Sequence, residues 1–318
     1  MRFNERNTMY YKYEPVEDRI LQNNEAKALA HMQAHLSRNM CLHTENIPYL
    51  AFPLLEQFPF LKHGFSTRFG GVSEGEFSAM NLYYNNDKKE HVLENYKRFC
   101  GSVGIMPEQL VLTSQQHTDN IKKVTKEDCG KGYCKERDYI AIDALITNEA
   151  EVALTVFGAD CVPLFFVEKN GAAIAVAHAG WKGTIANIAG KTVQALQAEY
   201  DVKAENLYVG IGPSICGDCF EIDDALAEKF RQELPIDVVE DALSTVQEQD
   251  GLHPHLDLWK VNYNLLVRAG VPKEQIIAGN VCTCHDPMNR YLFSHRATLG
   301  RRGGMAGVLM LTTSPKER

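Results

Sequence analysis

The sequence lacks a long hydrophobic run. No stretch approaches the ~18 apolar residues that a membrane-spanning helix needs, and the opening residues, MRFNERNTMYYKYEPVEDR, are charged and polar. A secretory signal peptide has an apolar central segment, which this opening does not contain. We therefore expect a cytoplasmic protein that has no membrane partner.

The sequence also lacks an excess of basic charge. Its formal net charge is −8, and its basic clusters are short. Surfaces that bind nucleic acid are usually strongly basic, so we expect no nucleic-acid partner. In the cytoplasm the nine cysteines should be thiols, which makes them candidates for core residues, metal ligands or nucleophiles rather than disulfides.

No internal repeat and no linker divides most of the chain. Residues 1–46 differ from the rest because they are polar, with one amphipathic helix expected at residues 23–38. We predict that residues 1–46 are an N-terminal appendage and that residues 47–318 form one catalytic domain. The sequence does not specify an oligomeric state.

Short apolar runs bounded by Gly, Asp or Pro predict most of the strands. They lie at residues 111–114, 140–147, 152–157, 163–167, 172–178, 207–211, 275–281 and 305–312. Helical spacing predicts helices at residues 88–100, 184–200 (with Thr184 as N-cap), 223–230 and 257–269. Because strands outnumber helices and do not alternate strictly with them, the pattern favours an α+β fold.

Three short segments place metal-ligand residues at predicted strand ends. They are Ser-Gln-Gln-His ending at His117, Ala-Asp-Cys-Val-Pro around Cys161, and His-Ala-Gly-Trp-Lys-Gly beginning at His178. Two imidazoles and one thiolate are a normal ligand set for catalytic zinc with an open fourth position. The spacing alone leaves another interpretation open, in which Cys161 is a small buried apolar residue.

These three segments, in this order, resemble the signature of the YfiH/YlmD-like family. Further blocks agree with the resemblance, which runs from about residue 48 to residue 311. They are His63 to Ser73, Met80-Asn81-Leu82, Asp143 to Thr147, Ile211 to Ile215, Asp257-Leu258-Trp259, Cys282-Thr283 and Phe293 to Arg296. The family was first described as multicopper polyphenol oxidases (laccases) and later as purine nucleoside phosphorylases with adenosine deaminase activity.

The resemblance implies a compact α+β domain with mixed sheets layered between helices. It implies one zinc ion per chain, bound by His117, Cys161 and His178. It also implies an enzyme that is both a glycosyltransferase and a hydrolase. As a glycosyltransferase it would phosphorolyse adenosine, inosine and guanosine, with methylthioadenosine as a further candidate substrate. As a hydrolase it would deaminate adenosine. Its small-molecule partners would be purine nucleosides and phosphate.

Other residues are candidates for substrate binding. Arg68, before a Gly-Gly pair, is a candidate phosphate ligand, although a surface Arg before a glycine turn is the alternative. Trp181 is a candidate to stack on a base, or else a core residue. Asn81 and Gln115 belong to the matched motifs and are expected to bind substrate.

The source of the catalytic proton is less defined. Zinc with an open position lowers the pKa of bound water to about 7, which suits deamination. Nucleobase deaminases of the zinc type place a Glu two residues after the ligand His, and neither His117 nor His178 has one. Asp160 is therefore the first candidate for the catalytic acid or base, and Asp143 is the second. The alternative for Asp160 is a structural role in a turn, with its carboxylate bonded to backbone N–H groups.

Three other functions remain as alternatives. A copper-dependent polyphenol oxidoreductase would make copper the cofactor, but it needs several His pairs. A peptidoglycan-editing hydrolase would use Cys161 as nucleophile and His178 as base. A closed four-ligand site would indicate a zinc module without catalytic activity.

Some further motifs are not expected to be functional. A structural zinc site has the residue types found in Cys216-Gly-Asp-Cys219 together with Cys282-Thr-Cys284-His285. The first pair, however, follows a Gly-Pro block that resembles one shared by the family for structural reasons. We therefore expect no second metal. His253-Pro-His255 is expected to be an exposed loop. Arg296, Arg301 and Arg302 lie in a glycine-rich segment that is a solvated loop or a contact to phosphate or ribose.

Overall fold

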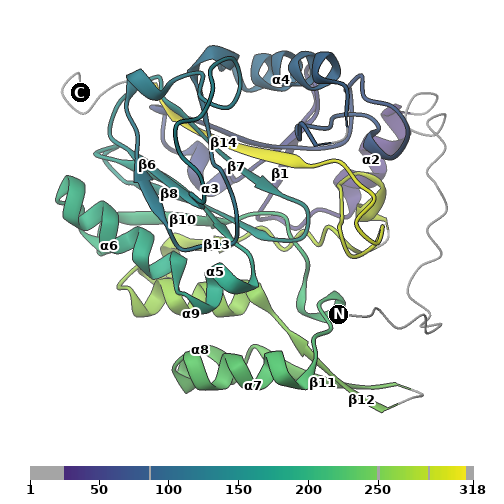
Figure 1. Ribbon diagram of the computed structural model, residues 1–318, viewed down its shortest axis with the longest axis vertical. Helices are drawn as coiled ribbons and strands as arrows, with labels where there is room; N and C mark the ends of the chain where they lie inside the picture. The colour runs from purple at the N-terminus through teal and green to yellow at the C-terminus, as the bar shows by residue number, and fades with distance from the viewer. Residues whose placement is uncertain (1–24, 86, 249–250, 286, 313–318) are drawn as a thin grey trace.

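Two six-stranded β-sheets packed face to face form the centre of the computed structural model, which describes residues 25–85, 87–248, 251–285 and 287–312 (Figure 1). The first sheet has the order β1 (Cys41–His43), β2 (Tyr49–Ala51), β3 (Leu61–Ser66), β14 (Met305–Leu311), β7 (Ala153–Gly158), β4 (Leu110–Leu112). The second has the order β13 (Ile276–Ala278), β10 (Leu207–Ile211), β8 (Val162–Glu168), β9 (Ile174–Ala179), β6 (Ala144–Thr147), β5 (Ile121–Lys123).

Both sheets are mixed. In the first, β4 runs parallel to β7, and the remaining pairs are antiparallel. In the second, β10 pairs parallel with β13 and β5 with β6, whereas β8 pairs antiparallel with β9 and β10. The central strands β7, β8 and β9 are buried along their whole length, which explains why they are continuous apolar runs rather than alternating ones.

Helices cover the outer faces of the two sheets (Figure 1). Helix α4 (Lys89–Val103) lies on the first sheet and buries Val92, Tyr96 and Phe99 at helical spacing. Helices α6 (Ile188–Tyr200) and α9 (Leu258–Arg268) cover the second sheet. The predicted α+β fold, with mixed sheets layered between helices, is confirmed.

Smaller elements complete the described chain. They are α2 (Glu25–Ala34), α3 (Pro53–Glu56), α5 (Trp181–Ile185), α7 (Asp224–Glu233), α8 (Ile236–Val239) and the hairpin of β11 (Leu243–Glu248) and β12 (Gly251–Leu256). None of the helices among the described residues combines the length and the apolar character that crossing a bilayer requires.

Two local predictions were wrong. Thr184 does not cap a long helix: it lies inside the short helix α5, and Asn187 caps the separate helix α6 by accepting a hydrogen bond from Gly190 N. The segment from His253 to His255 is part of strand β12 rather than an exposed loop. His255 is buried, and its Nδ1 lies 3.0 Å from the carbonyl oxygen of Gly217.

The described part of the predicted appendage packs against the domain. In α2 and the residues that follow it, Ala28, Met32 and Met40 are buried in the core between the sheets. The ring of His31 lies 2.8 Å from the hydroxyl of Tyr291, and β1 extends the first sheet by pairing with β2. Residues 25–46 therefore add both apolar contacts and an edge strand.

Candidate functional site

Three separate segments bring His117, Cys161 and His178 together. His117 lies in the loop after β4, Cys161 in the turn between β7 and β8, and His178 on β9. Since β7 and β8 belong to different sheets, Cys161 lies where the chain crosses from one sheet to the other. One ligand atom of each residue lies within 4.8 Å of the others, so the sequence-predicted trio forms one group.

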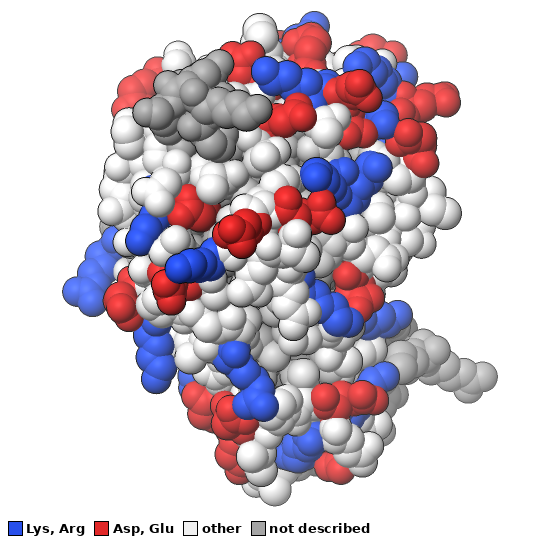
Figure 2. Space-filling view, turned by 90° about the vertical axis from the view of Figure 1, so that its left-hand side faces the viewer, with Lys and Arg blue, Asp and Glu red and all other residues white. Residues whose placement is uncertain are grey.

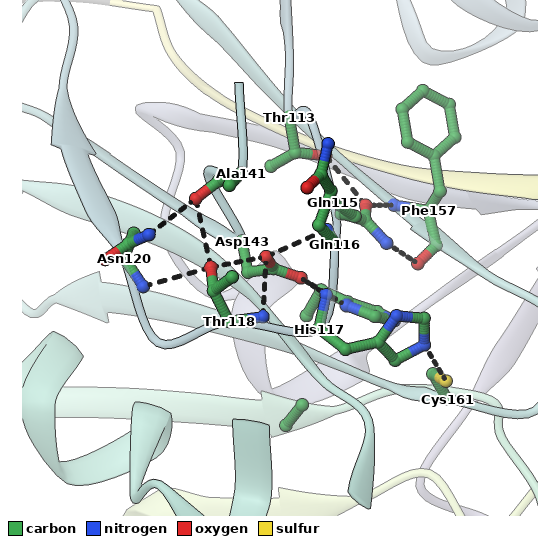
Figure 3. Close-up of polar contacts among 12 residues, drawn as sticks. Thr113, Gln115, Gln116, His117, Thr118, Asn120, Ala141, Asp143, Phe157 and Cys161 are labelled. Carbon is green, nitrogen blue, oxygen red and sulfur yellow. Dashed lines mark hydrogen bonds and ion pairs between the residues drawn. The ribbon is translucent and has the colours of Figure 1, made fainter. Parts of the chain in front are cut away.

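The Asp143 carboxylate is bonded to the loop that contains His117 (Figure 3). It accepts hydrogen bonds from the backbone N–H groups of Gln116, His117 and Thr118 and from the Thr118 hydroxyl. It also lies 2.8 Å from Nδ1 of His178. A metal-binding His is usually held in this way through its other ring nitrogen. Asp143 is therefore a positioning residue for two ligands, a role that we did not expect from the sequence.

The protonation of the group follows from these contacts. Burial alone would raise the pKa of Asp143, but hydrogen bonds from His178, Thr118 and Gln116 hold it at about 2. Burial likewise opposes the charged forms of Cys161 and His178. Their mutual attraction and hydrogen bonds nevertheless lower the pKa of Cys161 to about 6 and raise that of His178 to about 9. The site thus favours a thiolate, which is the form that binds a metal.

The backbone leaves room for an ion among the three side chains. His117 and Asp160, the residue before Cys161, have left-handed φ values of 61° and 91°, so the chain turns sharply at two of the three segments. At Gly180 a Cβ atom would lie 2.8 Å from Cδ2 of His117 and 3.1 Å from Sγ of Cys161, so glycine keeps the cradle open. Together with the two imidazoles and one thiolate, this space fits a zinc ion.

One side of the group faces solvent. His117 is exposed and Cys161 is half-buried, whereas His178 is only 3% exposed. No fourth His, Cys, Asp or Glu of the described chain joins the three. The arrangement is therefore that of a three-ligand site whose remaining position is accessible to water or substrate, as in catalytic rather than structural zinc sites.

The predicted substrate-binding residues have different surroundings. Asn81 is fully buried, and its amide bonds to the backbone of Tyr83 and Gly304 and to Asp87. The Gln115 side chain bonds to the backbone of Phe157 and to the Thr113 hydroxyl (Figure 3). Both amides thus shape the loops next to the site.

Arg68, Trp181 and Asp160 also lie partly or wholly within the protein. Arg68 is 5% exposed; its Nε donates to the carbonyl of Ser78, and its guanidinium stacks on Phe293. Trp181 is half-buried at the start of α5. The Asp160 carboxylate accepts from the hydroxyl of Thr283 and the backbone N–H of Arg296, both at 2.6 Å.

Tyr83 and His295 were not predicted as site residues, and Arg302 was predicted only as one of two alternatives, a solvated loop or a contact to phosphate or ribose. Partial burial lowers the pKa of His295, and the nearby charges of Arg302, Arg296 and His117 lower it further. The Arg302 guanidinium lies 5.4 Å from the centre of the Tyr83 ring, and its buried Nε has no hydrogen-bond partner in the described structure. A cavity of about 210 Å3 beside Tyr83 and Gln115 extends to Arg137 and Phe157. The motif containing His295 and the glycine-rich segment containing Arg302 were the sequence signals for this side of the site.

With this geometry established, comparison with known proteins gives the class. Residues 62–312 match the model of the family described as multi-copper polyphenol oxidoreductase laccase. This match covers most of the chain, so the protein belongs to that family, and the resemblance found in the sequence is confirmed.

Individual relatives within this family are named as purine nucleoside phosphorylases. The chain is 35% identical over 252 residues to purine nucleoside phosphorylase YlmD of Geobacillus stearothermophilus, covering 77% of this chain and 88% of the relative. It is 32% identical over 276 residues to a purine nucleoside phosphorylase of Bacteroides thetaiotaomicron, covering 84% and 98%. The crystal structure of YfiH from Bacillus licheniformis superposes with a TM-score of 0.78 at 30% identity and covers 86% of this chain and 100% of that one.

Proposed function

We propose that this protein is a zinc-dependent purine nucleoside phosphorylase that also deaminates adenosine. Its relatives bear the phosphorylase name, which supports an enzyme acting on nucleosides with phosphate. The observation on which the proposal rests most directly is the group of His117, Cys161 and His178, with three ligands and one accessible side. Adenosine, inosine and guanosine are the substrates we propose, with methylthioadenosine as a further one.

The two reactions need different groups. A zinc ion at this position supplies a Lewis acid that lowers the pKa of water to about 7, which serves deamination. In phosphorolysis, a phosphate oxygen forms a bond to the anomeric carbon as the bond to the purine nitrogen breaks. This requires an anion site close to the ribose, and an Arg fork is the side chain best suited to phosphate.

Arg302 is the phosphate ligand that the geometry favours, and Arg68 is the second. Arg302 is half-buried beside Tyr83, and its charge acts on His295, which in turn lies within electrostatic range of His117. Arg68 is more deeply buried and already donates to the Ser78 carbonyl. The cavity beside Tyr83 and Gln115 provides a place for the nucleoside.

Asp160 remains our candidate for proton transfer in deamination. It directly precedes Cys161 and is 8% exposed. Its two present hydrogen bonds hold the carboxylate in place. A carboxylate fixed next to a ligand can accept a proton from water and return it to the leaving amine.

The proposed location is the cytoplasm. All nine cysteines are free, including four that lie in one cluster. Free thiols at such short range persist in a reducing compartment, which supports this location.

Product analysis tests the proposed function. Purified protein is incubated with adenosine, with and without phosphate, and inosine, adenine and hypoxanthine are separated. We expect adenine only when phosphate is present and inosine under both conditions. Formation of neither product would reject the proposal, and inosine alone would reject its phosphorylase part.

A cysteine hydrolase is the second candidate, because Cys161, His178 and Asp143 are arranged as nucleophile, base and orienting acid. The lowered pKa of Cys161 and the raised pKa of His178 fit this arrangement. Zinc would make the thiolate unavailable for attack. Full zinc content together with slow alkylation of Cys161 by iodoacetamide excludes the hydrolase; a metal-free protein with a rapidly alkylated Cys161 supports it.

A copper oxidoreductase receives no support beyond the description of the family. A multicopper centre needs many imidazoles, because imidazole is the main ligand of its copper ions. The described residues form three groups of potential ligands, and only the group around His117 contains more than one His.

A further inference from the structure

A second group of ligand residues lies outside the site described above. Cys216 and Cys219 are in the loop after β10, and Cys282 and His285 are in the loop after β13. One ligand atom from each lies within 4.8 Å of the others. Because β10 and β13 are neighbouring parallel strands, and Ser214 pairs with Cys282 beyond them, the two loops leave the same end of the sheet together.

These residues have the burial and the hydrogen bonds of a metal cluster. Cys216, Cys219 and Cys282 are between 6% and 9% exposed. The backbone N–H groups of Cys216 and Cys284 point at Sγ of Cys282, at 3.3 and 3.4 Å, and such donors stabilise a thiolate. Sγ of Cys216 lies 3.5 Å from Nδ1 of His285.

The types of ligand atom indicate which metal ion the group would bind. Three thiolates and one imidazole are a closed ligand set typical of structural zinc. With Zn–S bonds of about 2.3 Å, tetrahedral geometry separates ligand atoms by roughly 3.8 Å, so the observed spacing needs only small inward shifts. We propose that Cys216, Cys219, Cys282 and His285 bind a second zinc ion, in a closed structural site.

The third group of potential ligands differs in each of these respects. Cys41, His43 and Glu56 lie at an edge of the first sheet and are none of them buried. Glu56 already contacts His43 Nε2 at 2.6 Å. With three members and no fourth ligand among the described residues, this group has the form of a surface ion pair.

The second zinc site would support the catalytic centre through Asp160. Thr283, which follows the ligand Cys282, donates to one oxygen of the Asp160 carboxylate. Ile215, next to Cys216, donates its N–H to the Asp160 carbonyl. Arg296 bonds to the other carboxylate oxygen and also to the carbonyl of Cys219. The two cysteine loops therefore hold the residue that precedes Cys161.

Metal counting separates the two sites. Zinc per chain is measured by plasma mass spectrometry on protein prepared with reductant. We expect two zinc ions in the wild type, one in Cys161→Ser and one in Cys282→Ser. Cys284→Ser is the matched control, since Cys284 is equally buried in the same loop but is not one of the four ligands; it should retain two.

Cobalt provides a test that does not depend on a folded Cys282 variant. Cys161→Ser, loaded with Co2+, should show the tetrahedral visible bands and the strong thiolate charge-transfer absorption of a site with three sulfurs. One zinc in the wild type that disappears in Cys161→Ser, or a Cys161→Ser protein without these cobalt bands, would overturn the proposal. Full zinc content in Cys282→Ser would also overturn it.

Discussion

The Asp143 carboxylate holds both histidines of the candidate metal site in position. It accepts hydrogen bonds from three backbone N–H groups of the His117 loop and orients His178 through the Nδ1 atom of that ring. With all these bonds formed inside the protein, Asp143 is committed to positioning rather than to proton transfer. This explains its low pKa, since every donor favours the ionised form.

Asp143→Asn should weaken metal binding. The amide retains the shape of the side chain, but its NH2 group faces donors, so the His117 loop and His178 lose their fixed orientation. Loss of such a partner typically costs 10- to 100-fold in metal affinity, which competition with a chromogenic chelator would measure. Asp119→Asn is the control in the same loop, because Asp119 pairs with Lys191 instead; equal zinc affinity in all three proteins would contradict the positioning role.

Arg302→Ala should separate the two proposed reactions. Loss of a charge-assisted contact to phosphate costs about 2–3 kcal/mol, roughly 30- to 150-fold. We expect the KM for phosphate to rise by that factor, while deamination falls much less because it uses no phosphate. Progress curves of both reactions at several phosphate concentrations would show this.

Arg68→Ala is the companion variant for the same measurement. A rise in phosphate KM in this variant alone would move the phosphate site from Arg302 to Arg68. Equal losses of both reactions together with a lower Tm would mean that Arg68 acts through its packing on Phe293.

At the scale of single elements, strand β3 contains a buried histidine with a testable effect on stability. His63 is 7% exposed and accepts a hydrogen bond from the N–H of Phe52. Burial lowers its pKa to about 4, from the ordinary value of 6.5. Between these two values the unfolded chain binds a proton that the folded protein does not, so stability is complete above pH 6.5 and falls as the pH drops toward 4.

His63→Gln should remove this pH dependence. The amide oxygen can still accept from Phe52, but the side chain does not titrate. Over this range the wild type should lose about 3 kcal/mol more stability than the variant, as measured by urea unfolding of the metal-loaded proteins at several pH values. Parallel pH profiles for the two proteins would show that His63 is protonated in the folded state.

Helix α2 and strand β1 give a second prediction at this scale. Deleting residues 1–46 removes Met32 and Met40 from the core and β1 from the sheet, and each fully buried side chain of this size stabilises by about 1.5–3 kcal/mol. We expect the Tm to fall by several degrees. A deletion of residues 1–24, which removes none of these contacts, is the control; identical Tm values for both deletions would mean that residues 25–46 contribute no stability.

The elements show which parts of the fold a sequence pattern can predict. Strands β7, β8, β9, β10 and β14 were found because buried strands are continuous apolar runs between turn residues. The starts of helices α7 and α9 were found because the predicted ranges begin at Asp223 and Asp257, which cap these helices by accepting hydrogen bonds from backbone N–H groups in the first turn. Strands β1, β2, β3, β5, β11 and β12 were missed. Strands β1 and β5 are not buried and lack a continuous apolar run, whereas the equally short β4 and β13 have one and were found.

The whole molecule brings the ligands together across its two sheets. The trio was predicted from motifs, whereas its geometry depends on the crossing between β7 and β8 and on the pairing of β8 with β9. Long-range pairing of this kind has no local signal, which explains why the positioning role of Asp143 was not foreseen. The residue types of the second cysteine group were recognised in the sequence, but a second metal was not expected, because only the pairing of β10 with β13 shows that its two halves lie together.

The surface fits a protein that acts on small molecules. On the face shown in Figure 2, acidic and basic side chains are interspersed, without a large area of one sign. Such a surface does not attract nucleic acid over an extended area.

Deamination of adenosine to inosine by the wild type and by Cys161→Ala is the most direct test of the central claim. Cys161 provides the only thiolate of the proposed catalytic zinc site, and its removal leaves the second cysteine group intact. We expect inosine from the wild type and little or no inosine from the variant, because zinc would no longer activate the attacking water, with zinc reduced by one ion per chain. Equal rates in the two proteins would contradict it.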